Sequence, residues 1–315
     1  KWRFNQEYSL NKMDMSSIDY FEKSKTVRLE SRDGKVFLVN KLGNTSIAYF
    51  DVAFPIIHGS FGEDGTMQGI FKSLDIPFVG ADILGSAICL DKDITKRLLR
   101  DSNIPIADFI TVYKEDKQTL VFEEVIEKLG VHFFVKPSNT GSSVGVSRVA
   151  DKTSFQAAVN NAFKYDKKIV LEEAIVGKEL ECAILGNQSP VASVLGEIRP
   201  AQDFYTYEAK YQDSNGAKMT ISAEIPTDVS DRLRQIAIKA YKITCCEGMA
   251  RVDFFLKNDN TFVVNEINTI PGFADASMYP KLWIASGVSY ADLIAKLIGL
   301  AIDKYQKNQE LETTV

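Results

Sequence analysis

Three polar residues near the C-terminal end of the chain have side chains suited to holding a hard metal ion. Asp253 lies in the apolar run Met249–Leu256, and Glu266 and Asn268 lie in the run 261–268. Two alternating apolar runs separated by four polar residues predict a β-hairpin with a short turn. Two carboxylates and an amide oxygen form a ligand set that suits magnesium bound together with phosphates.

The predicted hairpin would gather these side chains on one face. If Leu256 pairs with Thr261, the period-two alternation of side chains defines that face. It would carry Arg251, Asp253, Phe255, Phe262, Val264, Glu266 and Asn268. A solvated polar face is the alternative for a lone pair of carboxylates. Four convergent polar groups directly before Thr-Ile-Pro-Gly272 favour a binding site.

A loop of small residues and two lysines could bind phosphate. The loop Lys136 to Gly145 joins two predicted strands, and its small residues would let backbone N–H groups approach an anion while Lys136 adds a charge. A plain hairpin connection explains the loop equally well. Lys92 is a second candidate cation, although a lysine on a helix usually lies on a solvated face.

Further candidates lie near two strand ends. Glu172 and Glu179 flank the segment 174–176, which could offer backbone groups to a purine and a carboxylate to a ribose; an acidic strand end is the alternative. His58 follows a predicted strand and stands near two glycines and Glu63. A substrate-side role is therefore plausible for it, although a lone histidine at a strand end is more often structural.

Strands, glycine-rich loops and helices must position these residues, and their succession predicts an α/β protein. We expect strands at 46–57, 77–80, 131–135, 144–149, 168–171, 180–185 and 191–198. We expect one helix that ends at Leu74 and another at 90–101, with Leu90, Ile94 and Leu98 as its apolar stripe. Further helices are expected at 122–129, at 151–165, at 229–240 and from 290 to about 305. Segment 200–218 lacks periodicity, so we expect a surface loop that orders over the site when nucleotide binds.

Composition excludes several classes of function. The 315 residues allow two or three domains, and a net charge of −5 argues against nucleic acid or an anionic membrane as the main partner. No apolar run approaches the roughly 18 residues of a membrane span, and no export leader is evident. Two histidines exclude a histidine-rich metal site. The cysteines have no metal-ligand spacing and indicate a reduced, cytoplasmic protein: Cys89, Cys182, Cys245 and Cys246.

Taken in order, these elements resemble the D-alanine–D-alanine ligases of the ATP-grasp superfamily. The resemblance extends from about residue 50 to residue 300 in family order. The matching strings are His58-Gly-Ser-Phe-Gly-Glu-Asp-Gly-Thr-Met-Gln-Gly69, Leu90-Asp-Lys92, Val135-Lys-Pro137, Gly141-Ser-Ser-Val-Gly145, Phe204-Tyr-Thr-Tyr-Glu-Ala-Lys-Tyr211, Ala250-Arg-Val-Asp253 and Asn265-Glu-Ile-Asn-Thr-Ile-Pro-Gly272.

The resemblance implies an ATP-grasp fold of α/β (α+β) class with domains at 1–86, 87–174 and 175–315. ATP would lie between the central and C-terminal domains. By match to the family motifs, the ATP-binding residues would be Lys92, Lys136, Ser143, Glu172, Ile175, Glu179, Lys210 and Phe255. Two Mg²⁺ (or Mn²⁺) ions would be held by Asp253, Glu266 and Asn268. The catalytic and amino-acid-binding residues would be His58, Glu63, Ser142, Tyr211, Arg251, the Gly272 backbone, Ser277 and Met278.

The implied reaction joins two D-alanine molecules through an acyl phosphate, for peptidoglycan precursor synthesis by a homodimer. Alternatives are another ATP-grasp carboxylate–amine ligase, including one that accepts D-serine or D-lactate as second substrate, with Tyr211 arguing against D-lactate, or a non-catalytic ATP-binding module. The family's first strand and its glycine-rich loop with a substrate-binding glutamate are not found here. A chain that begins at Lys1 is therefore expected to be nearly inactive. Asp275 stands where a neutral residue is expected.

Overall fold

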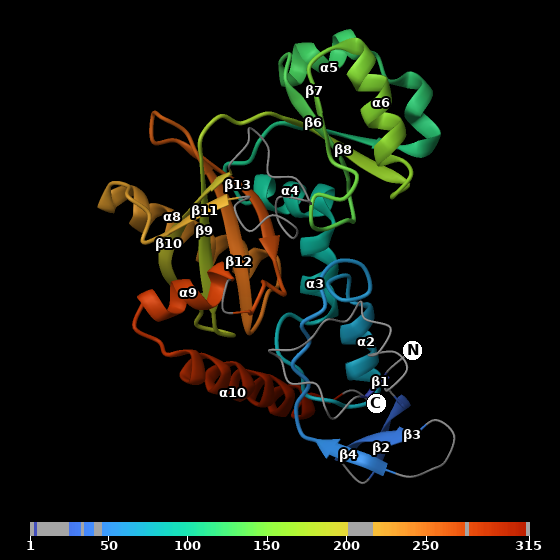
Figure 1. The fold of residues 1–315 in the computed structure, drawn as a ribbon, viewed down its shortest axis with the longest axis vertical. Helices are drawn as coiled ribbons and strands as arrows, with labels where there is room; N and C mark the ends of the chain where they lie inside the picture. The colour runs from blue at the N-terminus through green and yellow to red at the C-terminus, as the bar shows by residue number, and fades with distance from the viewer. Residues whose placement is uncertain are drawn as a thin grey trace.

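The molecule is built around three β-sheets stacked along its long axis (Figure 1). The computed structural model describes residues 3–4, 25–32, 35–40, 46–200, 217–274 and 277–312. Every strand ladder among these residues is antiparallel, and the parallel pairings are two isolated bridges, Ala53 with Phe78 and Ile106 with Val264. The fold is therefore the α+β variant of the expected mixed class.

Each sheet draws its strands from one part of the sequence. The first has the order β1 (Arg3–Phe4), β2 (Lys25–Arg32), β3 (Lys35–Asn40) and β4 (Ser46–Phe50). The second has the order β5 (Phe109–Tyr113), β8 (Lys168–Glu173), β6 (Phe133–Pro137) and β7 (Ser147–Val149). The third has the order β11 (Ala217–Ile221), β10 (Val191–Pro200), β9 (Lys178–Leu185), β12 (Met249–Leu256) and β13 (Phe262–Asn268).

Helices cover and connect these sheets. They are α2 (Thr66–Ser73), α3 (Ile83–Leu90), α4 (Lys92–Asp101), the 3-10 helix η2 (Lys114–Thr119), α5 (Phe122–Leu129), α6 (Lys152–Ala162), α8 (Thr227–Ile243), α9 (Met278–Ala285) and α10 (Tyr290–Gln309). Within the described part of the chain, no single helix is long and apolar enough to span a membrane. Helices α9 and α10 reach that length and apolar composition only when taken together, and the chain bends by 106° between them.

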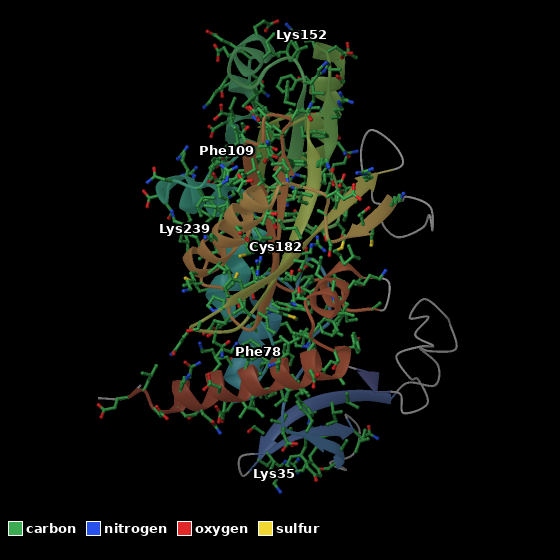
Figure 2. The ribbon with its side chains drawn as sticks, turned by 90° about the vertical axis from the view of Figure 1, so that its left-hand side faces the viewer. Lys35, Phe78, Phe109, Lys152, Cys182 and Lys239 are labelled. Atoms are coloured by element: carbon green, nitrogen blue, oxygen red, sulfur yellow. The ribbon has the colours of Figure 1, made fainter. Side chains whose placement is uncertain are left out.

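The third sheet is buried on both faces by helices. In β9, Leu180 and Cys182 belong to the core shared with α8, whereas Ala183 and Leu185 belong to the core shared with α9 and α10. This division follows from the alternation of side chains along a strand. Figure 2 shows Cys182 in the middle of the molecule, between the second sheet and the first. The expected amphipathic helix over 229–240 is confirmed as α8.

The second sheet has a separate core of its own. Phe133, Val135 and Leu171 pack against Phe155 of α6, and the Phe133 and Phe155 rings meet edge to face at 5.8 Å. Helix α6 begins with a capping box in which the Asp151 side chain accepts from the Ser154 N–H at 2.7 Å. The capped helix expected at 151–165 is therefore confirmed, with its end at Ala162.

The helix expected at 90–101 is wrong in two respects. The chain breaks at Asp91, whose carboxylate accepts from the N–H groups of Asp93 and Ile94 and so starts α4 there. The predicted apolar stripe is also wrong, because Ile94 is 38% exposed while Lys96 is buried. Lys96 faces inward because a carboxylate from the second sheet is available to pair with it.

Other differences lie around the first sheet. The strand expected at 46–57 ends at Phe50, and the strand expected at 77–80 is reduced to the single bridge of Phe78 with Ala53. Strands β2, β3 and β5 and helices α3 and α9 were not predicted. Strands β3 and β5 are apolar runs without alternation, whereas β2 does alternate Val27 and Leu29 with charged residues. The domain boundaries stay a prediction. Cys89, Leu99 and Ile104 pack into the core of the third sheet, so α3 and α4 connect the layers.

Candidate functional site

A cleft of about 530 Å³ opens over the β12–β13 end of the third sheet. Its walls come from the loop after β4, the N-terminus of α4, the Gly/Ser loop after β6, and the segment after β13. The structure brings together in this cleft the predicted residues His58, Glu63, Lys92, Ser142, Glu179, Arg251, Asp253, Phe255, Glu266, Asn268, Gly272, Ser277 and Met278. Their sequence separation means that only the folded chain forms the site.

The β12–β13 hairpin gathers the four polar residues, but by a different register from the one expected. Leu256 pairs with Phe262 rather than Thr261, and the register shifts again at Asn265. This bulge places Asp253 directly opposite Glu266 and Arg251 directly opposite Asn268. The same shift corrects part of the predicted face, since Phe262 and Val264 pack into the core beneath the sheet.

Arg251 is held by two carboxylates. Its Nε donates to Asp253 Oδ1 at 2.7 Å and its Nη2 donates to Asp253 Oδ2 at 2.7 Å, while Nη2 also lies 3.0 Å from Glu181 Oε1. Burial lowers the pKa of Arg251, but Asp253 and Glu181 outweigh burial and raise it well above its usual value. The guanidinium is therefore a fixed positive charge on the floor of the cleft.

The predicted metal ligands are suited to a hard cation. Asp253 and Glu266 form a direct cross-strand pair, and Asn268 Nδ2 donates to Asp253 Oδ2 at 2.9 Å. Like charges directly opposite each other destabilise a sheet, so a cation between them would be stabilising. Rotation of the Asn268 amide would present its oxygen. No three His, Cys, Asp or Glu side chains converge on a metal position within the described ranges, so the amide is needed as the third ligand.

His58 and Glu63 face the cleft from the loop after β4. Burial lowers the pKa of His58, so the imidazole is neutral at physiological pH. Burial raises the pKa of Glu63 to about 7, and the nearby Glu266 carboxylate adds to the rise. The Gly59 N–H donates to Glu63 Oε2 at 2.5 Å and opposes this effect. Glu63 therefore changes its charge in the physiological pH range.

The Gly/Ser loop after β6 approaches this wall of the cleft. Ser142 and Ser143 both have positive φ values, 54° and 59°, which is uncommon for residues other than glycine. Both serines lie at the centre of a turn that the Val144 N–H closes by donating to the Gly141 carbonyl at 3.1 Å, and successive N–H groups in a turn can form an anion-binding concavity. The loop is anchored by Lys92, whose Nζ donates to the Thr140 carbonyl at 2.5 Å and whose N–H donates to the Ser138 carbonyl at 3.0 Å.

A buried charge network lies behind the loop. Glu172 Oε1 lies 2.6 Å from Lys136 Nζ, and Glu172 Oε2 lies 2.7 Å from Lys96 Nζ. Burial alone would raise the pKa of Glu172, but the two lysines lower it to about 2. Lys136 and Glu172 are absent from the lining of the cleft. Each oxygen of Glu172 pairs with one lysine, so this carboxylate fixes the positions of the Lys96 and Lys136 ammonium groups.

The remaining predicted residues divide into two groups. Ile175 is described and is half-buried in the loop between β8 and β9. Lys210, Tyr211, Asp275 and most of segment 200–218 lie outside the described residues.

Two residues of the site were not predicted. Glu181 lines the cleft beside Arg251, and its position two residues after Glu179 on one strand could have indicated a shared face. Lys96 lies one helical turn after Lys92, which could have indicated that both lysines point toward the second sheet.

Comparisons with known proteins agree along most of the chain. The family model described as D-ala D-ala ligase C-terminus matches residues 98–299, and the model described as D-ala D-ala ligase N-terminus matches residues 2–81. The chain is 51% identical over 278 residues to D-alanine–D-alanine ligase A of Salmonella typhimurium, which covers 88% of this chain and 76% of the relative.

Solved structures show the same similarity. The D-alanine–D-alanine ligase of Coxiella burnetii matches with a TM-score of 0.83 and 38% identity, over 95% of this chain and 80% of that one. The Bacillus anthracis D-alanine–D-alanine ligase complexed with ATP matches with a TM-score of 0.71 and 32% identity, over 82% of this chain and 81% of that one.

Proposed function

The chain belongs to the D-alanine–D-alanine ligase family, and we propose that it joins two D-alanine molecules into D-alanyl-D-alanine with consumption of ATP, for peptidoglycan precursor synthesis. One observation carries this proposal. The Arg251, Asp253, Glu266 and Asn268 side chains lie side by side on two paired strands, at the end that leads to Gly272. A phosphoryl transfer followed by an acyl transfer needs such a combination of cation, metal ligands and backbone donor.

In the first step, the carboxylate of one D-alanine attacks the γ-phosphorus of ATP. The bond from the γ-phosphorus to the bridging oxygen breaks, which gives an acyl phosphate and ADP. Lys92, which lines the cleft, binds the phosphates in this proposal. Lys136 lies outside the cleft lining, where Glu172 orients its ammonium, and adds its positive charge to the phosphate site from behind the Gly/Ser loop. The positive-φ backbone at Ser142 and Ser143 adds donors beside the transferred group. His58 and Glu63 line the site of this D-alanine.

In the second step, the amine of another D-alanine attacks the acyl carbon. A tetrahedral oxyanion forms, and the bond from carbon to the phosphate oxygen then breaks to release phosphate and leave the peptide bond. Arg251 and the Gly272 N–H stabilise the oxyanion in this proposal. Ser277, whose Oγ accepts from the Ala274 N–H at 3.1 Å, and Met278 border the site of the second substrate.

Asp253, Glu266 and Asn268 would hold Mg²⁺ or Mn²⁺, which when bound neutralises phosphate charge during the transfer. The adenosine would lie beside Glu179, the Ile175 backbone and Phe255. Glu172, which the family match also assigns to adenosine, has both oxygens paired with lysines and is given the orienting role instead. Glu179 and Phe255 share one face of the sheet because they are cross-strand partners in β9 and β12.

We propose further that the enzyme is a cytoplasmic homodimer. All four cysteines are free, and Cys89 and Cys246 remain thiols with sulfur atoms 3.5 Å apart, which suits a reducing compartment. Large apolar side chains are exposed on the loop after β4 and on α3, namely Ile57, Phe61, Ile83 and Leu84. Such a surface suits association of two copies. Sedimentation analysis at micromolar concentration tests this, and a monomer would contradict it.

Release of phosphate from ATP tests the function when the full-length protein receives each candidate substrate separately. We expect phosphate release and a product of the mass of D-alanyl-D-alanine with D-alanine, and none with L-alanine. Mixtures of D-alanine with D-serine or D-lactate identify a different second substrate by the product mass. ATP binding without D-alanine-dependent phosphate release would instead indicate a non-catalytic nucleotide-binding module.

A further inference from the structure

Arg251 contacts a second carboxylate besides the predicted metal ligand. Its Nη2 atom lies 2.7 Å from Asp253 Oδ2 and 3.0 Å from Glu181 Oε1. The strand register explains this arrangement, because Glu181 of β9 is the cross-strand partner of Asp253, which is in turn the partner of Glu266. Three carboxylates therefore stand in one row across three strands, with one guanidinium bound to two of them.

Glu181 is directed to the cleft by its strand. Its neighbours Leu180 and Cys182 are fully buried in the core beneath the sheet, so alternation places the Glu181 side chain on the opposite face. That side chain is only 6% exposed. A buried carboxylate is costly without a charged partner, and Arg251 is the ion-pair partner that the structure gives it.

The two carboxylates that hold Arg251 differ in what else they can bind. Asp253 accepts hydrogen bonds from the guanidinium with both of its oxygens, one from Nε and one from Nη2. The ion pair of Glu181 involves a single guanidinium nitrogen, Nη2. A metal ion bound by Asp253 competes with Arg251 for those same oxygens. Arg251 would then lose its two hydrogen bonds to Asp253 during the reaction, when its guanidinium must stay in the cleft.

We propose that Glu181 is a positioning residue that keeps Arg251 in the cleft when Asp253 binds the metal ion. This inference rests on the proposed function. Without Glu181, Asp253 is the carboxylate that still holds Arg251 by direct contact in the described part of the chain, so Arg251 competes with the metal for Asp253 more strongly. Loss of Glu181 should therefore weaken metal binding, although Glu181 itself is not a metal ligand in this scheme.

Manganese binding tests the proposal without any turnover. Electron paramagnetic resonance measures the affinity of the full-length protein for Mn²⁺ in the presence of a non-hydrolysable ATP analogue and the absence of D-alanine. We expect Glu181→Gln, which keeps the size and a hydrogen-bond acceptor, to weaken Mn²⁺ binding about tenfold, as does removal of an outer-shell partner at other metal sites. Circular dichroism establishes that the variant is folded.

Glu197→Gln is the matched control. Glu197 lies in the same sheet, is 1% exposed and pairs with an arginine two residues away, Arg199. As the partner of Leu180 in the ladder it faces away from the cleft. We expect its substitution to leave Mn²⁺ affinity unchanged, which separates the proposed role from a general effect of removing a buried charge.

The Arg251→Met background decides between a positioning role and a direct one. If Glu181 acts through the guanidinium, Glu181→Gln should change Mn²⁺ affinity less than threefold once Arg251 is absent. An equal tenfold loss in both backgrounds would show that Glu181 acts on the metal itself and would overturn the proposal, as would the absence of any loss in either background. A wild-type protein that fails to make dipeptide would overturn the proposed function, and with it this inference.

Discussion

Replacing Glu63 with glutamine should stabilise the metal-free protein at alkaline pH and not at acidic pH. Burial raises the pKa of Glu63 from 4.5 to about 7 in the folded state. A raised carboxyl pKa means that the folded protein prefers the protonated form. Its contribution to stability is therefore fully present below pH 4.5 and is lost as the pH rises through about 7.

The magnitude follows from the shift. Subtracting 4.5 from 7 gives 2.5 pKa units, and at about 1.36 kcal/mol for each unit the loss is about 3 kcal/mol. Glutamine has no charge to bury and keeps an oxygen that can accept from the Gly59 N–H. The variant should therefore gain about 3 kcal/mol of unfolding free energy relative to wild type between pH 4.5 and pH 8.5.

Urea unfolding of wild type and variant in EDTA, at both pH values, measures this difference, and contributions from titrating groups that do not interact with Glu63 cancel between the two proteins. Glu124→Gln, at an exposed position of α5, is the matched control for the change of side chain. An equal effect of Glu63→Gln at the two pH values would refute the assignment of a raised pKa to this carboxyl.

Four other substitutions should separate catalysis, charge positioning and stability. Asp253→Ala or Glu266→Ala should abolish phosphate release while the circular dichroism spectrum is unchanged, and near-normal activity at low magnesium would contradict the metal assignment. Lys96→Met leaves Glu172 with one cation, so we expect a loss of about 3–5 kcal/mol in urea unfolding and a raised KM for ATP; an unchanged KM would argue against orientation of Lys136 through this network. Leu233→Ala, in the core beneath the third sheet, should cost about 2–5 kcal/mol without altering KM, and a changed KM would show that this core is coupled to the cleft.

The hairpin shows how far the site could be predicted from sequence. Alternation and polarity correctly grouped Arg251, Asp253, Glu266 and Asn268, because a strand directs every second side chain to one face. The pairing register was wrong by one residue at the turn, where Leu256 pairs with Phe262, and a bulge at Asn265 that leaves no periodic signal adds a second shift. The four residues were nevertheless grouped correctly. Beyond the bulge the pairing differs from the expected one by two residues, and a shift of two residues leaves each side chain on the same face.

Helix α4 shows where local pattern fails. Ile94 was expected inside and lysines outside, yet Ile94 is exposed and Lys96 is buried. The reason is tertiary, since the Glu172 carboxylate arrives from a strand 76 residues further along the chain and compensates the charge of Lys96. Hydropathy periodicity contains no information about such a partner. Lys96 was therefore missed, although it contacts Glu172, which was predicted.

The fate of a labelled carboxylate oxygen tests the proposed chemistry most directly. The full-length protein would be incubated with ATP, magnesium and D-alanine that carries oxygen-18 in both carboxylate positions, and the inorganic phosphate and dipeptide would be analysed by mass spectrometry. Attack of the carboxylate on the γ-phosphorus predicts one labelled oxygen in each phosphate released for each D-alanyl-D-alanine formed. Unlabelled phosphate, released with or without dipeptide, would contradict an acyl phosphate intermediate in this cleft.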